Sequence, residues 1–152
     1  MSKSRVPPEL VGTWRQMSGV APGSAGDELH TFGRHPVGFV QFTAEGRVTL
    51  MTVHADRAKP ATAVATAAEA ARLFETMIAY SGTFEVDGNK VIYDLDISWN
   101  QSWTGTKQVR HFELRGDKLQ VWTPDDFESP FKGHSGVHRI SFEKMSPGDR
   151  KL

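Results

Sequence analysis

The sequence predicts an all-β protein, an eight-stranded antiparallel up-and-down barrel with one amphipathic helix inserted between strands three and four. Short runs that alternate apolar and polar residues recur along the chain, and tight turns such as DGN at 87–89 and RGD at 115–117 separate them. Helical spacing occurs in one place, so strands do not alternate with helices as in a parallel α/β sheet. The interior of such a barrel is filled by side chains or holds one small ligand.

The strands follow one another from residue 12 onward. The first, GTWRQMSG at 12–19, places apolar, aromatic and threonine residues between glycines. The glycine- and proline-rich connection at 19–36 is expected to form a flap over the barrel. The other seven predicted strands are VGFVQFT (37–43), RVTLMTVH (47–54), GTFEV (82–86), KVIYDLDISW (90–99), TKQVRHFEL (106–114), KLQVWT (118–123) and GVHRISFE (136–143).

The helix is predicted within ATAVATAAEAARLFETMIAY at 61–80. Thr66 and Glu69 have the spacing of a capping box, so the helix should begin near residue 67 and run for about three to four turns. It either caps one end of the barrel with Phe74 and Ile78 or packs outside it. Its apolar positions recur at helical spacing: Ala67, Ala70, Ala71, Phe74 and Ile78.

The composition favours a small molecule or a protein as the partner. At 152 residues the chain suits one domain with a sizeable core. Its 18 basic and 18 acidic residues balance, which leaves no positive field for nucleic acid and no polybasic tract for a membrane surface. We expect a barrel at 10–145 between a flexible lead at 1–9 and a flexible tail at 146–152.

The chain contains no cysteine, which excludes disulfides, thiolate metal sites and a cysteine nucleophile. No signal peptide is expected at the N-terminus, and no window approaches the ~18 apolar residues of a membrane span. A cytoplasmic location is the expectation that follows.

Several short motifs occur in a consistent order. They begin with GTWR at 12–15, similar to the GxW signature of the first lipocalin strand, and continue with PVG at 36–38, EGR at 45–47, YSGTFEV at 80–86, GTKQVRHF at 105–112, Leu119 and Thr123-Pro124. Through them most of residues 10–143 resembles the bacterial and fungal lipocalin-like domain family. The resemblance implies a barrel with a small-molecule cavity, in a family that includes both binders and cofactor-free enzymes. Members of the family often carry histidine around the positions that Tyr93 and Asp94 hold in this chain. Any function of those histidines therefore cannot be inferred for this protein.

Alternation assigns a direction to the side chains of strand 90–99, because residues two apart share a face. Asp94 and Asp96 have the look of a paired acid and base, but they fall on the outer face and are expected to be solvated. The predicted inner face consists of Val91, Tyr93, Leu95, Ile97 and Trp99.

The same test on strand 106–114 points Gln108, Arg110 and Phe112 inward and His111 toward solvent. A buried arginine is costly unless it is paired. Arg110 is therefore either a structural plug or an anchor for a carboxylate, phenolate or enolate. Lipocalins stack an arginine over the first-strand tryptophan; Arg110 is one candidate for this structural role over Trp14, and Arg139, although out of phase with Ile140 and Phe142, is the alternative that would free Arg110.

Two histidines fall in phase with inward residues. His54 follows Leu50 and Thr52, and His138 precedes Ile140. Each is either a general base or hydrogen-bond donor for a ligand, or a satisfied core residue. No metal or cofactor is expected, because the chain lacks HxH and HExxH motifs, a nucleophile elbow and a phosphate-binding glycine loop.

Three hypotheses remain. In the first, the barrel binds a small hydrophobic molecule of aromatic, polyketide-like or terpenoid-like character; in the second, it is a cofactor-independent isomerase, cyclase, lyase or dehydratase. In the third, its interior is filled and it is a structural or interaction barrel. A homodimer is left open. The catalytic candidates are His54, Tyr93 and Arg110, and the ligand-binding candidates are Tyr80, Trp99, Trp103, Gln108, Phe112 and His138.

Overall fold

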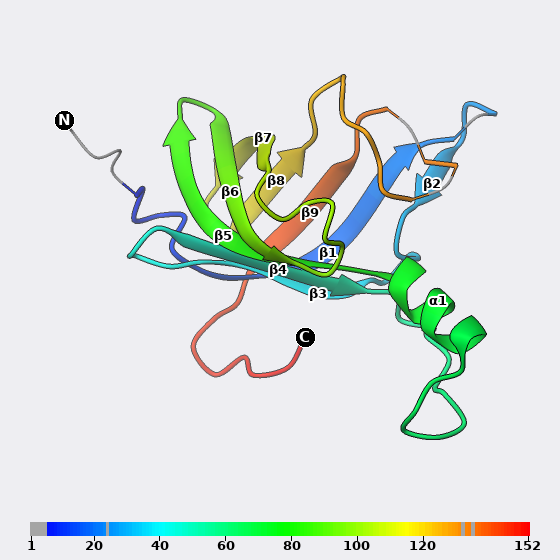
Figure 1. The fold of residues 1–152 in the computed structure, drawn as a ribbon. Coiled ribbons are helices and arrows are strands. Elements are labelled where there is room, and N and C mark those ends of the chain that lie inside the picture. Colours follow the sequence, from blue (N-terminus) through cyan, green and yellow to red (C-terminus); the bar gives the residue numbers. More distant parts are fainter. Residues whose placement is uncertain (1–5, 24, 132, 135) are drawn as a thin grey trace.

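The computed structural model describes residues 6–23, 25–131, 133–134 and 136–152. Residues 1–5 of the lead expected at 1–9 lie outside the described part. In chain order the elements are β1 (Gly12–Pro22), β2 (Glu28–His30), β3 (Val37–Phe42), β4 (Arg47–Val53), α1 (Ala67–Glu75), β5 (Met77–Asp87), β6 (Lys90–Ser98), β7 (Lys107–Arg115), β8 (Lys118–Trp122) and β9 (Arg139–Lys144) (Figure 1).

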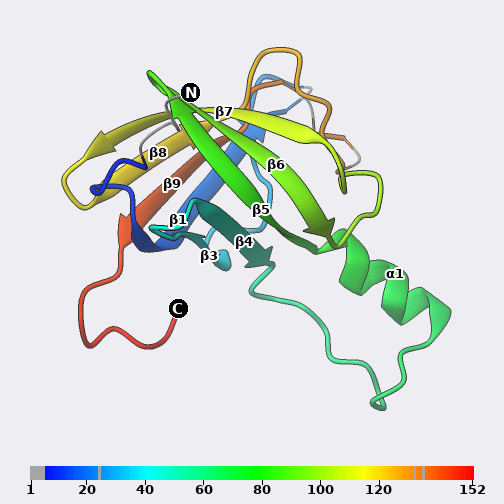
Figure 2. The same ribbon diagram turned by 60° about the vertical axis from the view of Figure 1, so that its left-hand side comes forward.

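Eight of these strands form a closed antiparallel barrel. Neighbours pair in the order β1-β3-β4-β5-β6-β7-β8-β9, and β1 also pairs with β9, which closes the barrel (Figure 2). The helix lies between β4 and β5, the third and fourth barrel strands. The predicted fold class is thereby confirmed.

The short strand β2 lies in the connection at 19–36, where the sequence predicts a flap. It pairs with the last residues of β1, from Val20 opposite His30 to Pro22 opposite Glu28. β1 is therefore longer than the predicted strand at 12–19, since its end has β9 on one side and β2 on the other. This extension carries residues 31–33 to one end of the barrel.

The two ends of the barrel differ. We call the end with the turns at 43–46, 88–89 and 116–117 the base, and the opposite end the mouth. At the base the buried Trp14 indole donates a hydrogen bond to the Leu10 carbonyl at 2.9 Å. The Lys144 ammonium lies 5.4 Å from the Trp14 ring and Arg139 stacks on Trp122, so neither Arg139 nor Arg110 is the cation over Trp14.

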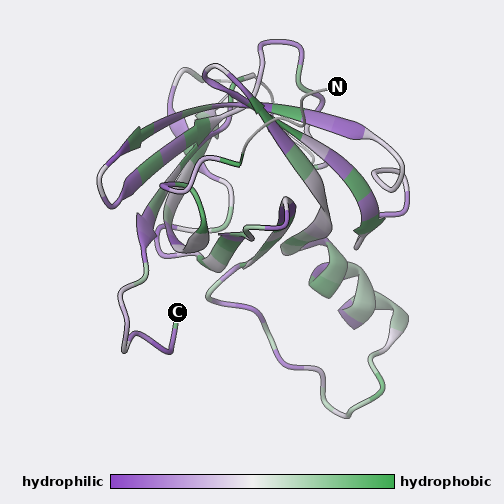
Figure 3. Ribbon diagram, turned by 90° about the vertical axis from the view of Figure 1, so that its left-hand side faces the viewer, coloured by the Kyte–Doolittle hydropathy of each residue, from purple (hydrophilic) through white to green (hydrophobic). Residues whose placement is uncertain are grey.

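Alternation of hydrophobic and hydrophilic residues along the strands separates the core from the surface (Figure 3). Asp94 and Asp96 face outward as predicted: Asp96 forms a two-pronged ion pair with Arg47 at 2.6 and 2.8 Å, and Asp94 lies 3.4 Å from Lys107. The buried apolar cluster consists of Leu10, Trp14, Val40, Phe42, Val48, Leu50, Tyr80, Phe84, Val91, Tyr93, Leu95, Trp103, Leu119, Val121 and Phe142.

A β-bulge breaks the alternation in β6. Ser81 of β5 pairs with Ile97 while Gly82 pairs with Leu95, so Asp96 is an extra residue on β6. Beyond it the phase reverses, and Ile97 is 61% exposed. The prediction that Ile97 faces inward is wrong, because a bulge shifts every later residue to the other face.

The helix begins at Ala67 with the predicted capping box, in which the Thr66 hydroxyl accepts from the Glu69 backbone and the Glu69 carboxylate accepts from Thr66. At nine residues it is shorter than predicted, because Ile78 already belongs to β5. None of its residues is buried, and it lies beside the mouth rather than plugging it (Figure 2). Within the described residues, no helix is long and apolar enough to cross a membrane.

We predict that Gly82→Ala destabilises the barrel by about 2 kcal/mol. A methyl group on Gly82 would collide with the Asp94 carbonyl oxygen and lie 2.8 Å from the Leu95 Cα, where the bulge brings β5 and β6 together. Denaturant unfolding measures the change. The matched control is Thr83→Ala on the exposed face of the same strand, expected to cost less than about 1 kcal/mol. Equal losses in the two variants would contradict the close approach at Gly82.

Candidate functional site

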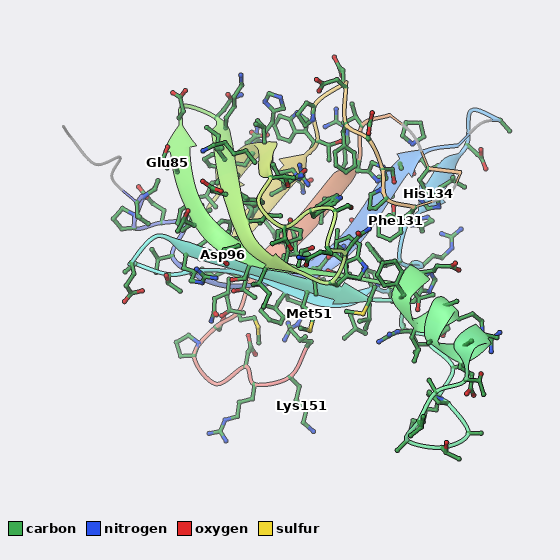
Figure 4. The ribbon with its side chains drawn as sticks, viewed as in Figure 1. Met51, Glu85, Asp96, Phe131, His134 and Lys151 are labelled. Carbon is green, nitrogen blue, oxygen red and sulfur yellow. The ribbon has the colours of Figure 1, made fainter. Side chains whose placement is uncertain are left out.

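A long connection covers the mouth of the barrel. This cover loop, residues 123–138, joins β8 to β9 and is described except at 132 and 135. Its two ends are tied together, since the Thr123 amide donates to the His138 carbonyl at 3.0 Å and the His138 amide to the Thr123 hydroxyl at 2.9 Å. Phe131 packs edge-on against Phe32 at 5.2 Å, and Figure 4 shows Phe131 and His134 together at this end.

Beneath the cover loop lies a cavity of about 60 Å³. At about 30 Å³ per water it has room for about two waters. Its wall is mainly apolar and aromatic, with a few polar groups, a composition typical of small-molecule sites. The lining residues are Gln16, Gly19, Val20, Thr31, Phe32, Leu50, Thr52, Ile78, Tyr80, Trp103, Arg110, Thr123, Phe127, Pro130, Phe131, His138 and Ile140.

Arg110 of β7 reaches the cavity from the side of the barrel and is 4% exposed. Its guanidinium lies 5.9 Å from the Trp103 ring and 5.0 Å from the Phe127 ring. One nitrogen donates to the Val109 carbonyl at 2.9 Å. No carboxylate of the described chain lies within 4.0 Å of it. The cation is therefore held by aromatic faces and lacks a counter-charge.

Tyr80 and Tyr93 stand one behind the other, with ring centroids 5.9 Å apart. Tyr80 lines the cavity; burial raises its hydroxyl pKa, and the nearby Arg110 cation partly opposes that rise. Burial also raises the pKa of Tyr93, and its ring packs against Phe42 with centroids 6.4 Å apart. Both phenols stay protonated at neutral pH, and Tyr80 is the one at the cavity wall.

His138 ends the cover loop just before β9 and is 6% exposed. Burial, followed by the positive charges of His134 and Arg110, lowers its pKa to about 4. Its ring packs edge-on against Phe127 at 5.3 Å, and its buried Nε2 has no hydrogen-bond partner. The imidazole is therefore neutral at pH 7 and has an open hydrogen-bonding position.

Sequence reasoning missed a polar pair in the cavity wall. The buried Thr52 hydroxyl donates to the buried Gln16 side-chain oxygen. Gly38 provides the space, since a methyl there would lie 2.7 Å from the Met51 carbonyl oxygen and collide with Thr52. The sequence did contain a signal for Gln16: it lies two residues after Trp14, so both side chains point to the same face of the strand. Thr31, whose buried hydroxyl lacks a partner, lies in a connection where no periodicity could have placed it.

The other candidates lie outside the cavity wall. His54 and Trp99 line a surface groove between α1 and the cover loop, and the His54 amide donates to the Thr76 carbonyl at 3.0 Å. Gln108 lines a second groove, the side groove, between residues 102–110 and the start of the cover loop. Phe112 packs partly buried against the core cluster. The structure thus brings together Tyr80, Trp103, Arg110 and His138 of the nine candidates.

The described residues contain no group of side chains that could hold a metal ion. Across the described ranges, no three His, Asp or Glu side chains converge as a metal site would require. His134 and His138 stack with ring centroids 6.3 Å apart.

Comparisons with known proteins concern the whole barrel. The model of the lipocalin-like domain family matches residues 11–145. A lipocalin-like protein from Bacteroides uniformis aligns with 13% identity and a TM-score of 0.49, covering 90% of this chain and 99% of that one. An uncharacterized protein from Bacteroides eggerthii aligns with 11% identity and a TM-score of 0.44 over the same shares. No curated protein matches the sequence.

We predict that His138 makes folding stability fall with acidification between about pH 6.5 and about pH 4. Its pKa is lowered in the folded state, so over this interval the unfolded chain binds more protons and is favoured as the pH falls. The expected loss is about 2 kcal/mol between pH 7 and pH 4.5, measured by denaturant unfolding. His138→Gln should remove this part of the slope. Parallel wild-type and variant profiles would contradict the burial of a neutral imidazole.

Proposed function

The chain belongs to the lipocalin-like domain family, and we propose that it binds a small, largely apolar molecule in the cavity at the barrel mouth. The observation that carries the proposal is the pairing of an aromatic wall with unsatisfied polar groups. Arg110 has no counter-charge in the described chain, and His138 has a buried nitrogen without a partner. Buried polar groups without partners are costly, so a ligand that pairs with them is expected.

The alternative of a filled structural barrel fits one half of the molecule. At the base, Leu10 and Trp14 are almost fully buried and leave little interior space. At the mouth, Phe32, Phe127 and Phe131 surround a cavity instead of closing it. Flat aromatic side chains with polar groups among them suit an aromatic ligand, and the volume of about 60 Å³ favours a small one over the polyketide-like or terpenoid-like alternatives.

A second candidate function is proton transfer without a cofactor. It is favoured by one observation: a neutral His138 shares the cavity with the Arg110 cation and the Tyr80 phenol. In this reaction the imidazole takes a proton from carbon and the guanidinium stabilises the enolate oxygen. A base with a pKa of about 4 is weak at neutral pH, and for this reason binding remains the first proposal.

Binding is tested with benzyl alcohol, a neutral single-ring probe, followed by NMR chemical shifts of the backbone amides. We expect saturable shifts at Thr31, Thr123 and His138. Ile140→Phe places a larger side chain in the cavity and should weaken binding about tenfold. The matched control, Ile97→Phe, makes the same change on the outer face and should bind as the wild type does. Equal weakening, or shifts confined to the surface grooves, would overturn the proposed site.

The catalytic alternative is tested with acetophenone in D₂O. Removal of a methyl proton by His138 and return of a deuteron from solvent would give exchange above the buffer rate, followed by NMR. His138→Gln should abolish the excess, while His111→Gln should retain it, because His111 stacks on Trp122 away from the cavity. Exchange at the buffer rate, or exchange that survives His138→Gln, would exclude this role for His138.

A further inference from the structure

Arg110 is a charged side chain in the wall of the cavity, and no carboxylate of the described residues forms an ion pair with it. Bringing a guanidinium out of water is costly, and stacking on aromatic rings offsets only part of that cost. Arg110 also lines the side groove, where the exposed acidic residues Asp126 and Glu128 lie. Neither carboxylate has an oxygen within 4.0 Å of a guanidinium nitrogen of Arg110.

The hydrogen bonds of Arg110 leave room for an anion. A guanidinium has five N–H donors, and the Val109 carbonyl accepts from one nitrogen. A carboxylate takes two parallel bonds from a guanidinium, which is the strongest arrangement for this group. His138 also lines the cavity, and its buried Nε2 has no hydrogen-bond partner within the described residues. Because basic and acidic residues balance over the whole chain, any preference for an anion here is local to this cation.

The size of the cavity limits the rest of the ligand. Sites for drug-sized ligands span roughly 300–1,000 Å³, whereas this cavity measures about 60 Å³. The rings of Phe32, Trp103, Phe127 and Phe131 line it. A cavity of about 150 Å³ holds benzene, so a single ring is the largest group that this smaller cavity can take with modest shifts of its side chains, and a fused ring system is excluded.

From these three observations, and resting on the proposed function, we infer that the ligand is a compact single-ring organic acid. Its carboxylate pairs with Arg110 and its ring packs among Phe32, Phe127 and Phe131. Tyr80 faces the same cavity as a protonated phenol and can donate a further hydrogen bond to the ligand.

The test compares benzoate with benzamide, which have nearly the same shape but differ in charge. NMR titration of the wild-type protein at pH 7 should show benzoate binding about tenfold more tightly, with shifts at Thr31, Thr123 and His138. The two-ring acid 1-naphthoate should bind more weakly than benzoate. Tighter binding of 1-naphthoate would overturn the single-ring limit.

Variants assign the preference to one residue. Arg110→Met should bring benzoate affinity down to that of benzamide. The matched control Arg139→Met removes an exposed arginine that stacks on Trp122 outside the barrel, and should leave both affinities unchanged. Arg110→Lys keeps the charge but loses the two-pronged geometry, so an intermediate preference is expected even where the methionine variant fails to fold.

The outcomes separate the two proposals. If benzamide and benzoate bind equally in the cavity, the inference of an acid is overturned while the proposed binding function stands. If neither probe shifts the cavity residues and benzyl alcohol also fails, both are overturned. If Arg139→Met weakens benzoate as much as Arg110→Met does, the preference reflects surface charge and the assignment to Arg110 is wrong.

Discussion

The pairing of β1 with β9 is the constraint on which the rest of the molecule depends. It closes the sheet, and closure gives every strand an inner face. β1 then contributes to each level of the interior: Trp14 at the base, Gln16 in the cavity wall, and Gly19 and Val20 at the mouth. Its last residues also hold β2, which brings Thr31 and Phe32 over the opening.

Closure divides the interior into a packed base and a hollow mouth. Toward the base the inward positions carry large apolar side chains, whereas near the mouth they include Gln16, Thr52 and Arg110. A polar residue inside a small barrel needs a partner. Gln16 and Thr52 satisfy each other, but the neighbours of Arg110 are aromatic rings, the Tyr80 hydroxyl and one backbone carbonyl, with no carboxylate of the described chain within 4.0 Å. The account of function depends on this difference.

Strand alternation predicted much of the site and failed where the backbone departs from regular pairing. It placed Arg110 inward and Asp94 outward, because β7 and the first part of β6 pair regularly. It failed at Ile97, where the bulge reverses the phase. His54 follows the last residue of β4, so its side chain points to a groove instead of the cavity. The cover loop has no periodicity, so the positions of Phe127 and Phe131 could not be derived from sequence.

A high-resolution crystal structure of the purified protein, grown without added ligand, tests the central claim most directly. The account predicts an open cavity below Phe131, with the Arg110 guanidinium at its wall and bound water or an organic anion beside it. An ion pair between Arg110 and Asp126 or Glu128, with aromatic side chains filling the cavity, would contradict the account. The mouth would then be as closed as the base.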